Sequence, residues 1–267
     1  MKKLMTIAAV ALCGAAMADT IESSNIVGYQ NLDSNASGAT MMAPTFLNVN
    51  FADKCTLADL SVTGYSAPVY DEKRDRWSGG TKGVFNLQFL TSQGKTEATY
   101  LWYDDGTRLG WYDETGTTKV DGTKVDVPAG KGLWCFGGGL KLVAAGNVNI
   151  NDISYESVAT GATPMGNPFP VDITLNDLTV TGYPAPVYDE KRDRWSGGTK
   201  GVFNLQFLTS QGKTEATYLW YDDGTRLGWY DETGTTKVDG TKVDVPAGKG
   251  LWCFGGGLTL VVPAPEL

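Results

Sequence analysis

The chain has 267 residues, which is long enough for one large β domain or for two domains of about 120 residues. Hydrophobic residues make up 42% and charged residues 19%, which excludes a disordered chain and a charge-rich helical array. Histidine is absent from the sequence. Hydrolases that use a histidine as general base, such as those with a Ser-His-Asp triad, are therefore excluded.

Residues 1–18 have the pattern of an export signal. A positive start at Lys2-Lys3 is followed by a short apolar stretch, and Ala16-Met17-Ala18 provides the small residues of a cleavage site before Asp19. An apolar stretch of about 12 residues is too short to span a bilayer, which needs about 20. We therefore expect a cleaved signal peptide, no membrane span, and a secreted, extracellular or cell-surface protein.

The net charge limits the partners. Removal of the two lysines of the signal peptide leaves 20 basic against 30 acidic residues, a net charge of −10. Such a protein repels nucleic acid and anionic lipid, so neither is predicted as a partner.

The processed chain keeps three cysteines, Cys55, Cys135 and Cys253. Cys135 and Cys253 lie in equivalent Leu-Trp-Cys-Phe segments, where alternate residues are expected to face a core. This favours buried small hydrophobic side chains over catalytic thiols or metal ligands. Three is an odd number in a compartment that permits disulfides, so their redox state stays open.

An internal repeat dominates the sequence. Thr56–Val143 recurs as Thr174–Val261 at an offset of 118 residues. A fainter match pairs Gly38–Met42 with Gly161–Met165 at an offset of 123, so the first copy carries five extra residues. We predict two tandem, nearly identical units, residues 19–145 and 146–267, after the signal peptide. Along the 88 aligned positions, four differ: Ala58/Asn176, Ser61/Thr179, Ser66/Pro184 and Lys141/Thr259.

Within a unit the pattern is that of short strands joined by tight turns. Apolar and polar residues alternate from Phe85 to Phe89, the period of a half-buried strand. Asp105-Gly106 and Asp121-Gly122 each separate two strand-like runs, which predicts two hairpins with type I′ turns. No segment shows a sustained period of 3.6 residues. We predict an all-β protein built of antiparallel β-sandwich or barrel-like units.

Aromatic residues supply the candidate binding sites. Trp77 and its equivalent Trp195 lie in charged, glycine-closed loops that follow Tyr70 and Tyr188. An aromatic ring on such a loop can stack on a sugar, while neighbouring Asp and Arg side chains bond its hydroxyls. Alternatively the tryptophan folds back as a lid on the sandwich edge, or an arginine stacks on it. The candidate ligand-binding residues are Tyr70, Asp75, Arg76 and Trp77, with Tyr188, Asp193, Arg194 and Trp195 in the second copy.

The other tryptophans of a unit are predicted to serve the structure. Trp134 lies in a dense apolar strand and is expected in the core. Trp102 and Trp111 are expected to be structural rather than ligand-binding.

Paired carboxylates are the remaining candidates for chemistry. They are Asp104/Asp105 and Asp113/Glu114, with Asp222/Asp223 and Asp231/Glu232 in the second copy. A glycosidase needs two carboxyl groups about 5–5.5 Å or about 6.5–9.5 Å apart in a cleft, which short sandwich strands seldom build. Acidic residues beside glycines are better explained as turn formers. We therefore expect a protein that is not an enzyme.

Two further motifs are weak. Gly94-Lys95-Thr96 lacks the earlier glycine that a P-loop requires, since position 89 is Phe89. Asp71 with Asp75 could hold calcium, but no Asp-x-Asp-x-Asp-Gly loop supports that reading. No cofactor is predicted.

Three segments resemble a β module of exported bacterial proteins with the pattern GNPYP … y-W-d … PGqGFfv. They are Gly-Asn-Pro-Phe-Pro at 166–170, Tyr-Leu-Trp-Tyr-Asp at 218–222 and Val-Pro-Ala-Gly-Lys-Gly-Leu-Trp at 245–252. Ser-Asn-Ile-Val-Gly-Tyr-Gln at 24–30 is similar to the mature N-termini of exported proteins in the Verrucomicrobia–Lentisphaerae group. The first unit departs from the pattern, with Ala43-Pro44-Thr45-Phe46. The resemblance implies export and a β fold and carries no assigned activity.

Two functions therefore follow as expectations. The first is a non-catalytic surface or matrix binding module for polysaccharide or another cell-surface component, with two equivalent sites. The alternative is a structural or adhesive protein that associates with itself through sheet edges and takes no small ligand.

Overall fold

The computed structural model describes residues 27–47 and 55–264. Strands account for 52% of the chain and helices for 5%, which confirms the all-β class. Within the described ranges the helical elements are single 3₁₀ turns: η1 (Leu57–Asp59), η2 (Gly122–Lys124), η3 (Leu175–Asp177) and η4 (Gly240–Lys242). None of them is long and apolar enough to cross a membrane. The expected export signal lies outside the described residues.

The N-terminal half, residues 27–148, contains two larger antiparallel sheets. One has five strands in the order β10 (Leu109–Tyr112), β9 (Thr96–Asp104), β8 (Thr81–Leu90), β12 (Leu133–Phe136) and β2 (Ala39–Met42). The other places β13 (Lys141–Val148) beside β1 (Val27–Asp33), β3 (Phe46–Leu47) and β5 (Leu60–Thr63). β4 (Cys55–Thr56) pairs with β11 (Asp126–Val127), and β6 (Val69–Asp71) pairs with β7 (Arg76–Ser78).

The C-terminal half, residues 153–264, contains a corresponding set of sheets without a counterpart of β3. Its five-stranded sheet has the order β15 (Thr163–Gly166), β24 (Gly250–Phe254), β20 (Thr199–Leu208), β21 (Thr214–Asp222) and β22 (Leu227–Tyr230). Its three-stranded sheet has the order β14 (Ile153–Glu156), β25 (Thr259–Val262) and β17 (Thr179–Thr181). The short pairs are β16 (Ile173–Thr174) with β23 (Asp244–Val245) and β18 (Val187–Asp189) with β19 (Arg194–Ser196).

Each half has its own hydrophobic core. Phe85, Leu87 and Phe89 of β8 are buried, so the predicted alternation of this strand is confirmed. The buried residues Phe203 and Leu205 do the same in β20. Cys135 and Cys253 are buried free thiols, as expected of small hydrophobic side chains, and Cys55 is buried and free as well. Burial raises the pKa of the Cys55 thiol to about 12, which keeps it protonated.

The first predicted hairpin is present with a shifted turn. β9 and β10 pair across a turn closed by the bond from Asp105 N to Arg108 O, so Gly106 and Thr107 are its central residues. Gly106 has a φ of +86°, and Thr107 has no positive φ. A type I′ turn needs a positive φ at both central residues, so the turn type predicted is wrong.

The second predicted hairpin is wrong. Asp121 does not turn the chain back on itself, because its side chain accepts a hydrogen bond from Thr123 N and opens η2. β11 then pairs with β4, far away in the sequence. Gly122 is required for packing: a Cβ there would lie 2.9 Å from Ala58 N. The Asp-Gly dipeptide therefore lies in a hairpin turn at positions 105–106 and permits a close backbone contact at positions 121–122.

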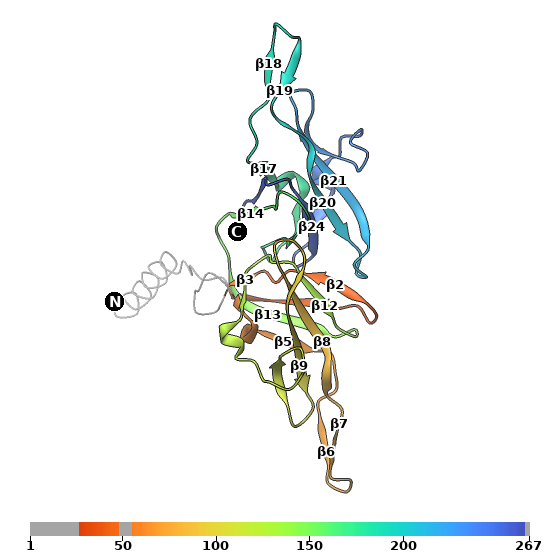
Figure 1. The fold of residues 1–267 in the computed structure, drawn as a ribbon. Coiled ribbons are helices and arrows are strands. Elements are labelled where there is room, and N and C mark those ends of the chain that lie inside the picture. The colour runs from red at the N-terminus through yellow and green to blue at the C-terminus, as the bar shows by residue number, and fades with distance from the viewer. Residues whose placement is uncertain (1–26, 48–54, 265–267) are drawn as a thin grey trace, which may run out of the picture.

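The two halves are stacked end to end in an elongated molecule (Figure 1). They meet through β2, β12, β15 and β24, and we call this contact the junction. The hairpins β6–β7 and β18–β19 project at opposite ends of the molecule (Figure 1), and we call them the terminal hairpins. β13 continues through positions 145 and 146, where the sequence analysis divides the chain, to Val148.

Candidate functional site

Each terminal hairpin is a two-stranded ribbon with a charged tip. Within the described residues, β6 pairs only with β7, and Asp71 lies opposite Arg76 at the end of the ladder. Asp71 Oδ1 accepts hydrogen bonds from the backbone N–H groups of Lys73 and Arg74, which builds the turn. Asp75 closes it with a φ of +50°, a left-handed conformation that aspartate tolerates well.

A tyrosine and a tryptophan face each other across the hairpin. Tyr70 lies opposite Trp77, and their ring centroids are 5.2 Å apart at an interplanar angle of 56°. Tyr70 is 43% and Trp77 41% exposed, which is unusual for large aromatic side chains. In the other hairpin, Tyr188 and Trp195 have the same separation. The pair therefore offers two partly exposed, tilted rings at each end of the molecule.

The tyrosine hydroxyl is fixed by the tip. Tyr70 Oη donates a hydrogen bond to Asp75 Oδ1, and Tyr188 does so to Asp193. These bonds raise the pKa of both tyrosines, because the phenolate would face a carboxylate. The hydroxyl stays protonated at neutral pH and its oxygen can still accept a hydrogen bond from a ligand.

The tryptophan also anchors the hairpin. A Cβ on Gly106 would lie 2.1 Å from Trp77 Cδ2, so the indole rests directly on the backbone of the β9–β10 turn. Gly224 makes the same contact with Trp195. One part of each ring is therefore covered by the body of the protein while the rest is exposed. The covered side of the ring fits the lid that the sequence left as one alternative. The exposed side leaves ligand binding, the other alternative, as a prediction.

Arg76 is placed apart from the aromatic pair. It neighbours Trp77 in the same strand and lies opposite Asp71, so its side chain belongs to the other face of the hairpin. Within the described ranges, the cations that lie over aromatic rings are Arg108, Lys131 and their equivalents, and none lies over Trp77. Of the predicted site residues, the structure brings Tyr70, Asp75 and Trp77 together and leaves Arg76 aside.

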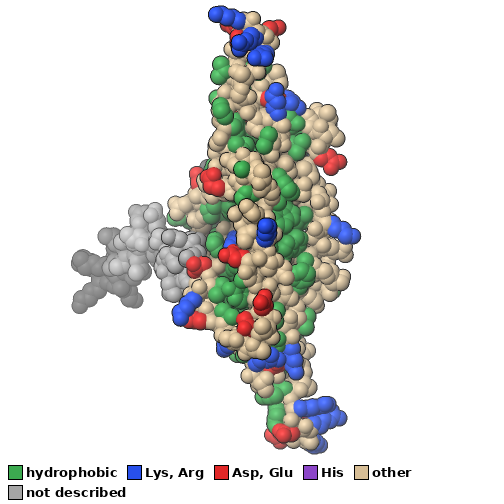
Figure 2. Space-filling view, viewed as in Figure 1, with side chains coloured by type: hydrophobic (Ala, Val, Ile, Leu, Met, Phe, Trp, Pro, Cys, Tyr) green, Lys and Arg blue, Asp and Glu red, His purple; other side chains and the backbone are tan. Residues whose placement is uncertain are grey.

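Charged side chains of both signs gather at the two extremities of the molecule (Figure 2). Residues 71–76 of the first hairpin contain three acidic and three basic side chains, so the tip carries no net formal charge. Arg74 Nε lies 3.7 Å from Asp71 Oδ2 in an exposed ion pair. A tip of this kind offers hydrogen-bond donors and acceptors without a strong field of either sign.

The paired carboxylates are turn formers. Asp105 is 4% exposed and accepts hydrogen bonds from Thr107 and from the backbone and guanidinium of Arg108. Burial alone would raise the pKa of Asp105, but these bonds together hold it well below its ordinary value. Asp113 binds three threonines of its own turn, and the bond from Thr115 is the main cause that lowers its pKa to about 2.

The acidic loop considered for calcium is occupied by its own chain. Asp71 receives the backbone N–H groups of the tip, and Asp75 receives the Tyr70 hydroxyl. Among residues 27–47 and 55–264 there is no group of three or more His, Cys, Asp or Glu side chains that could hold a metal ion.

The remaining tryptophans lie in two different places. Trp102 and Trp111 are buried, and their indole N–H groups donate to Tyr65 Oη and Leu60 O, so the expected structural role is confirmed. Trp134 was expected in the core of one unit. It lies instead at the junction, where its ring centroid is 6.2 Å from that of Trp252.

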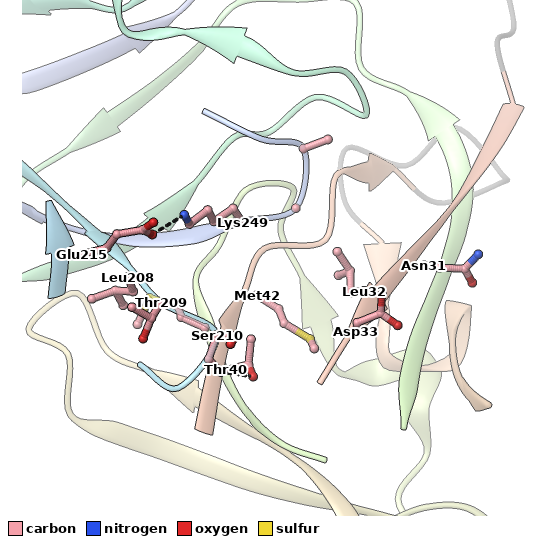
Figure 3. Close-up of a pocket in the computed structure, with 13 residues that line it drawn as sticks. Asn31, Leu32, Asp33, Thr40, Met42, Leu208, Thr209, Ser210, Glu215 and Lys249 are labelled. Atoms are coloured by element: carbon pink, nitrogen blue, oxygen red, sulfur yellow. Dashed lines mark hydrogen bonds and ion pairs between the residues drawn. The ribbon is translucent and has the colours of Figure 1, made fainter. Parts of the chain in front are cut away.

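Two grooves flank the junction, and sequence reasoning missed both. The larger has a volume of about 550 Å³, and Figure 3 shows Lys249 reaching Glu215 along its wall, with an Nζ–Oε2 distance of 3.0 Å. The smaller, of about 400 Å³, contains the equivalent pair Lys131 and Glu97 at 3.8 Å. No sequence motif marks these grooves, because each is lined by residues from both halves.

Comparison of the chain with protein-family models, with curated proteins and with solved structures finds no match. The terminal hairpins and the junction therefore have to be interpreted from their own geometry.

Proposed function

We propose that this chain is an exported, non-catalytic binding module that takes extracellular polysaccharide, or another cell-surface component, on its terminal hairpins. The observation that supports this is the exposed Tyr70–Trp77 pair with the Asp75 carboxylate beside it, repeated at the other end of the molecule. Exposed aromatic rings bind the apolar faces of sugars, and the polar tip supplies partners for hydroxyl groups.

The charge favours an uncharged polymer. The hairpin tip has no net formal charge, and the processed chain, with 20 basic and 30 acidic residues, carries −10. A polyanion would be repelled by the whole molecule without a compensating basic cluster at the site. A neutral polysaccharide in the medium or on a cell surface is therefore the ligand class that we assign.

The organisation of the chain belongs to the same proposal. We infer two tandem β-sandwich units, divided near residues 145 and 146, that follow a cleaved export signal at 1–18. Separate sheets and separate cores in the two halves support the division, as does the sequence repeat.

Retention on immobilised polysaccharides tests the function. Processed protein (residues 19–267) is passed over a panel of neutral and acidic polymers, together with a Trp77→Ala/Trp195→Ala variant. The expected result is binding to a neutral polymer that weakens about tenfold or more in the variant, since about 1.4 kcal/mol of lost stacking is a factor of ten. Leu109→Ala/Leu227→Ala is the matched control, because both leucines are 60% exposed and lie outside the hairpins.

Two outcomes would contradict the proposal: retention of the tryptophan variant at the level of the wild type, or no retention on any polymer of the panel. Circular dichroism of each variant shows that it is folded before its binding is compared.

Self-association is the second candidate. Val69 is 63% exposed on the hairpin, and the ribbon's outer edges are unpaired within the described residues. Such edges can add a strand from another molecule. Light scattering would then show a mass that rises with protein concentration and does not change when polysaccharide is added.

A further inference from the structure

The junction has approximate twofold symmetry. Met42 forms an antiparallel bridge with Lys249, and the equivalent residues Met165 and Lys131 form the same bridge. Trp134 and Trp252, which are equivalent, meet edge to face with centroids 6.2 Å apart. Three buried residues complete a small apolar cluster around the two rings: Met41, Leu90 and Leu208. The two halves thus present nearly the same surface to each other.

Glycines permit the close approach on both sides. A Cβ on Gly94 would lie 2.8 Å from the ring of Trp252, and one on Gly212 would lie 2.7 Å from the ring of Trp134. A Cβ on Gly250 would meet Met41 Cγ at 2.2 Å. Real Cβ atoms essentially never come this close, so the contact depends on these residues. This precision is typical of a specific interface rather than of loosely tethered domains.

One pair of equivalent positions breaks the symmetry. Ala43 comes directly after β2, and Gly166 is the last residue of the equivalent strand β15; the two face each other across the junction. A Cβ built on Gly166 would lie 2.4 Å from Ala43 Cβ. If two N-terminal halves met in this way, two alanines would occupy that position and the backbones would have to move apart. An N-terminal half facing a C-terminal half has one alanine and one glycine, and fits.

We propose that the junction is a selective pairing surface that also accepts a second copy of this chain, with the C-terminal half of one molecule on the N-terminal half of the other. Ala43 against Gly166 directs N-terminal halves to C-terminal halves and disfavours pairs of N-terminal halves. Within one molecule, the connection Asn149–Asp152 between β13 and β14 keeps the complementary half at an effective concentration of about millimolar. A second copy competes where the protein is concentrated or while it folds.

The test uses full-length processed chains in which one side of the junction is disabled. Trp252→Asp disables the junction surface of the C-terminal half and leaves that of the N-terminal half (the N-terminal surface) intact. Trp134→Asp disables the N-terminal surface and leaves that of the C-terminal half (the C-terminal surface) intact. Each variant is measured alone and in an equimolar mixture by size-exclusion chromatography with light scattering. The mixture is expected to form a 1:1 complex. Trp252→Asp alone is expected to dimerise at least tenfold more weakly than the mixture associates.

A third variant tests the role of Ala43 directly. Adding Ala43→Gly to Trp252→Asp removes the methyl groups that would clash where two N-terminal surfaces meet. Two N-terminal surfaces should then pair, and the monomer should become a dimer. The unchanged Trp252→Asp chain is its matched control. If the tryptophan variants do not fold, Leu208→Lys and Leu90→Lys disable the same two surfaces at another buried contact.

Two results would overturn the proposal. Folded variants that form no mixed complex at about 100 µM would show that the surface does not pair between molecules. Dimers of Trp252→Asp that are as stable as the mixed complex would show that Ala43 and Gly166 do not select the partner.

Discussion

Asp105 and its equivalent Asp223 are the most deeply buried acidic side chains of the described residues, at 4% and 3% exposure. Asp105 Oδ2 lies 2.8 Å from Arg108 Nη2, and the guanidinium in turn covers the ring of Tyr103 at 3.7 Å. The ion pair, the turn and the aromatic contact therefore depend on one carboxylate. A buried charge held in this way contributes stability as long as it is ionised.

Replacing Asp105 with asparagine should reduce the free energy of unfolding at pH 7 by about 2 kcal/mol, below the value for a fully buried pair because Arg108 is one-third exposed. The pKa of Asp105 is lowered by folding from its ordinary value of 3.8. Its stabilisation is therefore complete above about pH 5 and is lost as the pH falls below 4. Urea unfolding at pH 7 and pH 3 should show a smaller pH dependence in Asp105→Asn than in the wild type. Equal dependence in both would contradict this assignment.

At the scale of elements, the terminal hairpin is held to the body through the contact between Trp77 and Gly106. Gly106→Ala would place a methyl group inside the indole and also strain a residue with a φ of +86°. We expect the hairpin to detach while the cores stay folded. Trypsin should then cleave the tip at Lys73, Arg74 and Arg76 several-fold faster than in the wild type.

Gly38→Ala is the control for this prediction. Gly38 has a similar φ of +96°, and a Cβ there would meet nothing within 4 Å. Both variants carry backbone strain of about 1–2 kcal/mol, but only Gly106→Ala displaces the tryptophan. Equal cleavage rates in the two variants would show that the indole does not anchor the hairpin.

Local patterns carried the prediction of the elements. The alternation of β8 was predicted correctly because buried and exposed positions differ in residue type along this one strand. The tyrosine, aspartate and tryptophan of the candidate site were found because one short hairpin contains all three. The role of Asp121-Gly122 was predicted wrongly, because Gly122 packs against Ala58, which lies in a distant part of the chain. The position of Trp134 was predicted wrongly for the same reason, because this side chain packs against Trp252 of the other half.

At the scale of the whole molecule, the two hairpins point away from each other at opposite ends (Figure 1). Sites arranged in this way bind two separate polymer strands more readily than two stretches of one strand. If polysaccharide binds as proposed, the wild type should cross-link the polymer and raise the turbidity of the mixture, with a maximum near equivalence. Trp77→Ala alone should still bind but should not cross-link. Turbidity equal to that of the wild type in this single-site variant would contradict the arrangement.

The most direct test of the proposed function is a count of binding sites by calorimetric titration with a short oligosaccharide of the retained polymer. The prediction is two equivalent sites in the wild type, one in Trp77→Ala, one in Trp195→Ala, and none in the double variant. Two sites in the double variant, or a single site in the wild type, would contradict binding at the terminal hairpins.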